Sequence, residues 1–169
     1  AYGNPVTFTA GDRPFHAVDG SPDTAWTVGA FNSVVGERLV LELPEPALVP
    51  SLTVLQAALE GQNRWITHLR VHLDDTHVEV VLDDTSRSEP GQVLQLPNRV
   101  VGRIVLEIRG TDVGPLDYYA GMTGVGFAEV AVPGVNPEET LRMPVDLGAA
   151  LGPDSGAELV ILATRQRSD

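Results

Sequence analysis

The sequence predicts an all-β protein that folds as a β-sandwich of about eight strands, followed by a short C-terminal extension. Two observations support this fold class. Apolar residues recur with a period of two, and the apolar segments are separated by turns rich in Gly, Pro and Asp. Strands of this number and spacing are typical of a β-sandwich. The expected strands lie at 6–9, 38–43, 52–56, around Leu69 and Val78, and at 94–96, 104–109 and 127–132.

The alternation is clearest in two of these segments. Leu39, Leu41 and Leu43 share one face, because successive side chains of a strand point to opposite sides. In 104–109, Ile and Leu at the even positions alternate with Val, Glu and Arg at the odd positions. Each segment therefore presents one apolar face to a core.

One hairpin can be placed in register. With Asp74 and Asp75 as the two turn residues, position 73 pairs with 76 and position 71 pairs with 78. This register sets Arg70 against Glu79 on one face, where they form a weak cross-strand ion pair. The opposite face is apolar and comprises Leu69, Val71, Leu73, Val78 and Val80.

The same register places His72 beside His77, with His68 a few positions away. Imidazoles bind zinc and nickel, but no third ligand is obvious, because the neighbouring Glu79 is matched to Arg70. Exposed histidines near a strand tip are ordinarily solvated. The sequence leaves both interpretations open.

Net charge and composition restrict the possible partners. The chain has a formal net charge of -12, a pI near 4.6, and 11 basic residues, so it lacks the clustered Lys and Arg of a nucleic-acid-binding surface. The same acidity opposes binding to anionic lipid headgroups but suits a neutral polysaccharide or a divalent cation. The absence of cysteine excludes disulfides and thiolate metal sites. We expect no nucleic-acid partner.

Hydropathy predicts no membrane span within these residues, since no apolar run approaches the roughly eighteen residues that a membrane helix needs. The start, Ala1-Tyr2-Gly3-Asn4, has neither the basic nor the apolar region of a targeting signal. We therefore expect that the chain was cut from a longer protein.

The sequence changes character after Pro133. A polar connector at 136–139 precedes two strand-like runs, at 141–147 and 159–163, although 147–151 also fits a single helical turn. We predict a β-sandwich module at 1–134. Residues 135–169 form a strand-containing extension, or a connector to a following module.

The segment from His16 to Trp26 contains oxygen-bearing groups spaced like the ligands of a hard cation. Asp-Gly and Ser-Pro force a bend, and Asp19 and Thr24 supply side-chain oxygens. Calcium accepts six to eight such ligands, including main-chain carbonyls. The alternative is an ordinary turn before a core tryptophan.

The pattern A-x-D-G-x-x-x-T-x-W, with Gly126-Phe127-Ala128-Glu129-Val130 about a hundred residues later, resembles the discoidin or coagulation factor 5/8 type C family. That family has a jelly-roll β-sandwich and includes many carbohydrate-binding modules. The resemblance implies a structural calcium ion and a Trp26 that is buried beneath the calcium loop. The implied ligands are the carbonyls of His16, Ser21 and Ala128, the side chains of Asp19 and Glu129, and both oxygens of Thr24.

Two further phrases, 12–20 and 24–31, resemble the soluble modules of actinobacterial α-(1→3)-arabinofuranosyltransferases. Those large membrane enzymes build the arabinan of the cell envelope. The resemblance implies a fragment at the periplasmic, extracytoplasmic face of a membrane protein. Its implied partners are polysaccharide of the arabinan or arabinogalactan type and other modules of the parent chain.

Modules of this class bind sugars through loops at one end of the sandwich, where an aromatic ring stacks on the sugar and polar groups bind its hydroxyls. Three loops carry such residues. Tyr118 and Tyr119 point in opposite directions if extended, so at most one meets a ligand. The candidate ligand-binding residues are Phe31, Asn32, Gln62, Asn63, Arg64, Trp65, Tyr118 and Tyr119.

Trp65 has two possible roles. Counting back by twos from Leu69 and Val71 places it on the inner face, as a core residue at the sandwich end. The alternative is a ligand contact. Gln62, Asn63 and Arg64 are expected to be exposed polar contacts.

Catalytic signatures are absent from the sequence. It contains no nucleophile elbow, phosphate-binding loop or zinc-protease motif, and the glycines of 121–126 precede a strand. The doublets Asp74-Asp75 and Asp83-Asp84 follow strands, where Asp favours turns, so we interpret them as turns. We predict a non-catalytic carbohydrate-binding module. The alternative is a structural or protein-docking module without sugar binding.

Overall fold

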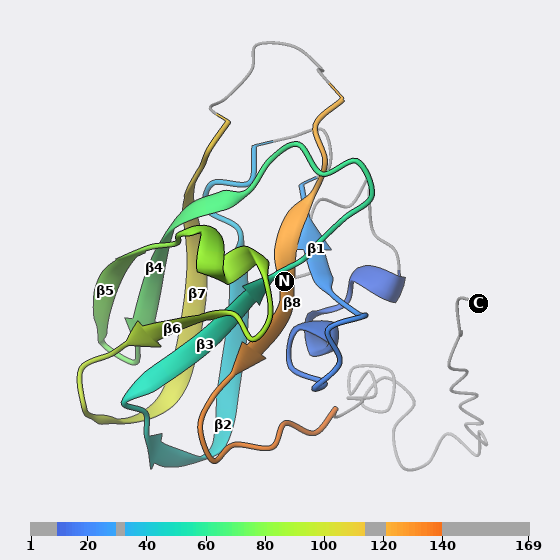
Figure 1. Cartoon of the computed structure of the whole chain (residues 1–169). Coiled ribbons are helices and arrows are strands. Elements are labelled where there is room, and N and C mark those ends of the chain that lie inside the picture. The colour runs from blue at the N-terminus through green and yellow to red at the C-terminus, as the bar shows by residue number, and fades with distance from the viewer. Residues whose placement is uncertain (1–9, 30–32, 114–120, 140–169) are drawn as a thin grey trace, which may run out of the picture. The chain divides into compact units, whose positions relative to one another are not determined.

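Alternating burial organises the strands into two layers. The computed structural model describes residues 10–29, 33–113 and 121–139, which form eight strands and three short 3-10 helices (Figure 1). Buried apolar side chains from both sheets form one hydrophobic core. The predicted all-β sandwich of about eight strands is therefore confirmed. The strands are β1 (Trp26–Val28), β2 (Arg38–Leu48), β3 (Ser51–Gln56), β4 (Ile66–Leu73), β5 (Thr76–Val81), β6 (Gln92–Gln95), β7 (Val100–Thr111) and β8 (Val125–Ala131); the helices are η1 (Ala10–Asp12), η2 (Pro14–Ala17) and η3 (Asp84–Arg87).

Each sheet has four antiparallel strands. The first has the order β1-β8-β3-β6, and the second has the order β2-β7-β4-β5. Strands that are distant in sequence are thus neighbours, as where β8 pairs with both β1 and β3. The loop at 18–25 precedes β1, so the pairing of β1 with β8 places this loop near the last strand of the sandwich.

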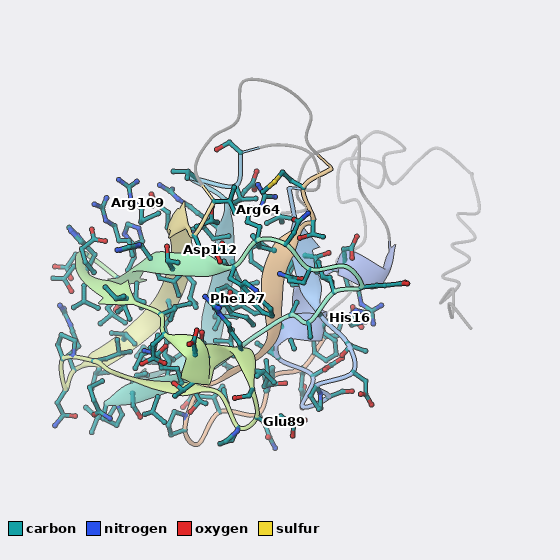
Figure 2. The ribbon with its side chains drawn as sticks, turned by 45° about the horizontal axis from the view of Figure 1, so that its top comes forward. His16, Arg64, Glu89, Arg109, Asp112 and Phe127 are labelled. Carbon is teal, nitrogen blue, oxygen red and sulfur yellow. The ribbon has the colours of Figure 1, made fainter. Side chains whose placement is uncertain are left out.

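The core lies between the sheets. Leu39, Leu52, Leu69 and Leu106 have no exposed surface. Trp26 is fully buried, as the family resemblance implied, and its ring stacks on Phe127 with a centroid separation of 5.9 Å. Phe127 lies in the middle of the sandwich in Figure 2.

The predicted hairpin register is confirmed. Leu73 pairs with Thr76, and the guanidinium of Arg70 lies 2.6 Å from the Glu79 carboxylate. Asp74 adopts a left-handed conformation, with a φ of 53°. Its carboxylate accepts main-chain N–H bonds from Gly102 and Arg103 of β7, which holds this aspartate in the turn.

The close approach of β1 and β8 explains why position 126 is a glycine. A Cβ at Gly126 would collide with the carbonyl oxygen of Trp26 on the paired strand β1. Only a residue without a side chain allows this contact.

The strand list differs from the prediction at one end. Strand β1 was not predicted, because three residues are too few to show an alternating pattern. The predicted strands at 6–9, 141–147 and 159–163 lie outside the described residues.

The chain divides into two compact units, Ala1–Pro137 and Glu138–Asp169. Both sheets belong to the first unit. Within the described ranges, no helix is long and apolar enough to cross a membrane.

Candidate functional site

Polar groups of the predicted calcium loop, between η2 and β1, converge on the Asp19 carboxylate. The Thr24 hydroxyl oxygen lies 2.9 and 2.8 Å from the two carboxylate oxygens of Asp19, and 3.1 Å from the carbonyl oxygen of Ser21. Gly20 permits the bend by adopting a φ of 76°. Three of the predicted donor groups thus lie around one point.

Glu129 reaches this loop from β8. One of its carboxylate oxygens accepts a hydrogen bond of 3.0 Å from the main-chain N–H of Gly20. Burial raises the pKa of Glu129, and the nearby charge of Asp19 raises it further, against the effect of the Gly20 hydrogen bond. The distant acid that the family resemblance implied is therefore beside the loop, where its carboxylate and that of Asp19 repel one another.

The predicted carbonyl donors lie on neighbouring elements. His16 belongs to η2, which packs against β8, and Ala128 precedes Glu129 in that strand. The imidazole of His16 contacts the carbonyl of Gly11 instead of the loop, so only the main-chain oxygen of His16 is a candidate.

The donor set fits a hard cation. Among the described residues, no three His, Cys, Asp or Glu side chains form a metal-binding group. The predicted calcium ligands do not require such a three-side-chain group, because they combine two carboxylates with carbonyl and hydroxyl oxygens. Oxygen-only ligation of this type suits calcium.

A second cluster lies where the loop at 57–65 meets the segment before β8. The Asn63 amide donates to the carbonyl of Gly121 at 3.0 Å and accepts from the main-chain N–H of Thr123 at 2.9 Å. The main-chain N–H of Asn63 in turn donates to the Thr123 hydroxyl. Asn63 is exposed, as predicted, and it joins the loop at 57–65 to the segment at 121–124 before β8.

The prediction that Arg64 is exposed is wrong. Only 5% of its surface is accessible, and one guanidinium nitrogen donates to the carbonyls of Gly29 and Thr123, at 2.6 Å each. Burial lowers the pKa of Arg64, and the charge of Asp112 opposes this effect. Figure 2 shows Arg64 toward the upper end of the sandwich in that view. The physical reason for its burial is that carbonyl groups of two other loops require a donor there.

Arg64 and Asn63 together connect the segments after β1, after β3 and before β8. The described parts of these segments, Gly29, Asn63, Arg64 and 121–123, therefore lie together at one end of the sandwich. Four of the candidate residues, Phe31, Asn32, Tyr118 and Tyr119, lie outside the described residues.

Gln62 is partly buried and bonds within its own loop. Its amide accepts from the main-chain N–H of Leu59 and donates to the carbonyl of Arg64. Gln62 thus shapes the loop, and its expected exposure is only partial.

Trp65 does not share the inner face, so the parity argument is wrong for this residue. The pairing of β4 with β7 shifts register twice between Ile66 and Leu69, and the buried position falls on Ile66. Irregular pairing of this kind breaks the period of two. Trp65 is half-buried.

Two residues that the sequence interpretation missed surround Trp65. The guanidinium carbon of Arg87 lies 5.1 Å from the centroid of the indole, a cation–π contact. The Asp112 carboxylate accepts the main-chain N–H of Trp65 at 2.7 Å. Arg87 belongs to η3 and Asp112 follows β7, so no local sequence signal could have placed them here.

The acidic doublets act as turns. Asp83 caps η3 by accepting the main-chain N–H of Thr85 at 2.8 Å. The pKa of Asp83 is lowered by the hydrogen bond from the Thr85 hydroxyl and, secondly, by this main-chain bond. Asp75 pairs with Arg99 at 3.0 Å.

Comparison with solved structures finds this fold in several proteins. A segment of the arabinofuranosyltransferase AftD from mycobacteria matches 77% of this chain with a TM-score of 0.57 and 22% identity, and the match covers 10% of the AftD chain. The CBM32 of AlyQ, solved with 4,5-unsaturated mannuronic acid, matches 74% of this chain and 88% of its own, with a TM-score of 0.53 and 15% identity.

A pectin-binding carbohydrate-binding module matches 73% of this chain and 81% of its own, with a TM-score of 0.52 and 16% identity. No protein-family model matches the sequence, and no curated protein matches it. At these identities the likeness shows the β-sandwich fold. This chain spans about a tenth of the length of the AftD chains that it matches.

Proposed function

We propose that this chain is a non-catalytic carbohydrate-binding module of a larger cell-envelope arabinofuranosyltransferase. It binds or positions arabinan-type polysaccharide at the extracytoplasmic face of the membrane. The structural likeness to a segment of AftD and to two carbohydrate-binding modules supports this proposal. Tethering a polymer beside an active site raises its local concentration even when the module binds weakly.

The meeting of Gly29 after β1 and Thr123 before β8 at the Arg64 guanidinium carries the proposal. Arg64 and Asn63 hold these segments together at the end of the sandwich, and the half-buried Trp65 follows them in the sequence. A partly accessible indole offers an apolar surface to a sugar ring, and neighbouring polar groups can bond its hydroxyls. This combination suits a neutral glycan in an acidic protein.

We also propose that Asp19, Thr24 and Glu129, with the carbonyls of His16, Ser21 and Ala128, hold a calcium ion. The cluster of oxygens around Asp19 and the mutual repulsion of Asp19 and Glu129 support this assignment. The ion would neutralise both carboxylates and join the loop before β1 to β8. Its role would be structural.

One observation favours the alternative, a structural or protein-docking module of the same enzyme. Arg64 and Gln62 donate hydrogen bonds to main-chain carbonyls of the protein, and Arg87 covers one side of the Trp65 ring. Fewer groups therefore remain for a sugar than the sequence suggested.

A titration monitored by NMR separates the two functions, because the chain has two tryptophans in different settings. With arabinan oligosaccharides, the indole N–H signal of Trp65 should shift saturably, while that of the buried Trp26 should not. Trp65→Ala should abolish binding, and Trp65→Phe should retain part of it because an aromatic face remains. Galactan oligosaccharides test the sugar preference.

If Trp65 and Asn63 do not respond to sugar at millimolar concentration, the chain is not a sugar-binding module. The structural alternative would then stand. Equal shifts of Trp26 and Trp65 would indicate a nonspecific effect and would also count against sugar binding at the loops.

A further inference from the structure

We propose that the outer face of the second sheet carries a binding site for a divalent late first-row metal ion, such as zinc, nickel or copper, formed by His72 and His77 and oriented by Glu107. This site is separate from the calcium loop and from the loops around Arg64. It does not depend on the function proposed above.

The two histidines are direct cross-strand partners. His72 of β4 pairs with His77 of β5, and both side chains lie on the face opposite to the buried Val71 and Leu73. Their ring centroids are 5.8 Å apart and the ring planes are tilted by 48°. His77 is exposed, and the side chain of His72 is 28% accessible, so an ion can approach from solvent.

The separation of the rings suits a bridging ion. A nitrogen–metal bond of about 2.0–2.1 Å places an ion about 3.2 Å from the ring centroid. Two rings that share one ion therefore lie roughly 5 Å apart at a tetrahedral angle and roughly 6 Å apart at a wider angle. The observed 5.8 Å falls within this range.

Glu107 supplies the orienting contact that the sequence did not reveal. One of its carboxylate oxygens lies 2.9 Å from Nε2 of His72. Since Glu107 also accepts from Arg38 and Arg109, it is an acceptor, and Nε2 of His72 is the donor. In neutral His72 this leaves the lone pair on Nδ1, and a carboxylate behind the ring makes that nitrogen a better ligand.

The site has two protein ligands, so water completes the coordination. Within the described ranges no group of three His, Cys, Asp or Glu side chains surrounds one point. The guanidinium groups of Arg38 and Arg109 offset the charge of Glu107. We therefore expect weaker binding than at a four-ligand zinc site. Imidazole ligands favour late first-row ions over calcium.

The test is calorimetric titration of the untagged chain with Zn²⁺ and Ni²⁺ in excess Ca²⁺, at slightly alkaline pH. We expect one saturable site, at least about tenfold weaker in His72→Gln and in His77→Gln. Glu107→Gln should weaken binding about tenfold while leaving both imidazoles in place. His68→Gln is the matched control, because His68 lies on the same face of β4 and contacts Thr67 instead.

His77 is exposed at a strand edge, so its substitution tests the site without disturbing the core. The proposal is overturned if neither ion binds at millimolar concentration. It is also overturned if His68→Gln weakens binding as much as His77→Gln does, since binding would then follow the number of histidines. An imidazole NMR spectrum that places the His72 proton on Nδ1 would contradict the assigned role of Glu107.

Discussion

The Glu129 carboxylate accepts the main-chain N–H of Gly20 at 3.0 Å, across 109 positions of sequence. This contact joins the loop before β1 to β8, and it places Glu129 beside Asp19. Two carboxylates in one partly buried place repel each other unless a cation lies between them. The contact is therefore the structural basis for the proposed calcium site, which we call the calcium clamp because it joins the loop before β1 to β8.

Calcium should stabilise the chain through this clamp. We expect the Tm to rise on adding calcium, by an amount equivalent to about 2.7 kcal/mol when free calcium is a hundredfold above Kd. Asp19→Ala and Glu129→Gln should lose this rise. Thermal melting in calcium and in a chelator measures both effects.

Asp23→Ala is the matched control for the clamp, because Asp23 is an exposed aspartate of the same loop. It should retain the full response to calcium. A wild-type Tm that is the same in calcium and in chelator would contradict the proposed donor set.

Glu107 should make the free energy of unfolding depend on pH in the acidic range. A hydrogen bond from His72 is the main cause that lowers the pKa of Glu107 from 4.5 to about 2; burial opposes it, and Arg109 and Arg38 reinforce it. Because the folded pKa lies below the unfolded one, the stabilising contribution is complete above about pH 4.5 and is lost as the pH falls through about 2. The free energy of unfolding in urea should fall as the pH falls across this range, and Glu107→Gln should make that slope smaller.

Glu79→Gln provides the comparison for Glu107. The side chain of Glu79 is 55% accessible and pairs with Arg70, so at neutral pH its loss should cost under about 1 kcal/mol. Glu107→Gln should cost about 1–3 kcal/mol, because charged hydrogen-bond partners of a buried group are lost. Equal losses in the two variants would show that the burial of Glu107 is unimportant.

Removal of the Arg64 guanidinium should loosen the loop end. Arg64→Met leaves the carbonyls of Gly29 and Thr123 without this donor, and we expect a loss of about 1–3 kcal/mol. Hydrogen exchange should accelerate around Thr123. Arg99→Met is the control, since Arg99 pairs with an Asp75 side chain that is 79% accessible. If both variants are equally stable, Arg64 does not hold the loops.

Two strand glycines should respond differently to an added methyl group. Gly126→Ala should destabilise the chain by more than about 2 kcal/mol, because its Cβ collides with the main chain of Trp26. Gly102→Ala should be tolerated, since the nearest atoms lie at 3.7 and 3.9 Å. Chemical unfolding of the two variants measures the difference, and a tolerated Gly126→Ala would contradict the tight pairing of β1 with β8.

Local patterns were enough to predict the sandwich and one hairpin. Asp74 and Asp75 set the register, and that register correctly matched Arg70 with Glu79. These relations are short in sequence, and a strand's period of two carries them directly. The family resemblance, and not a local pattern, implied correctly that Glu129 would lie near the loop before β1.

The same reasoning failed where pairing becomes irregular or where a partner comes from another strand. The register shifts between Ile66 and Leu69 moved Trp65 off the inner face. Arg64 was predicted to be exposed, because the carbonyls that accept its hydrogen bonds belong to segments distant in sequence. Arg87 reaches Trp65 only through the tertiary fold.

The sequence by itself determined the all-β class, the hairpin register and the oxygen-rich loop at 16–26, because each depends on neighbouring residues. Only the tertiary structure decided that Arg38 of β2 and His72 of β4 meet at Glu107, which lies 69 and 35 positions away from them. The order β2-β7-β4 creates that meeting. Strand order follows from how whole faces pack together, and no local pattern encodes it.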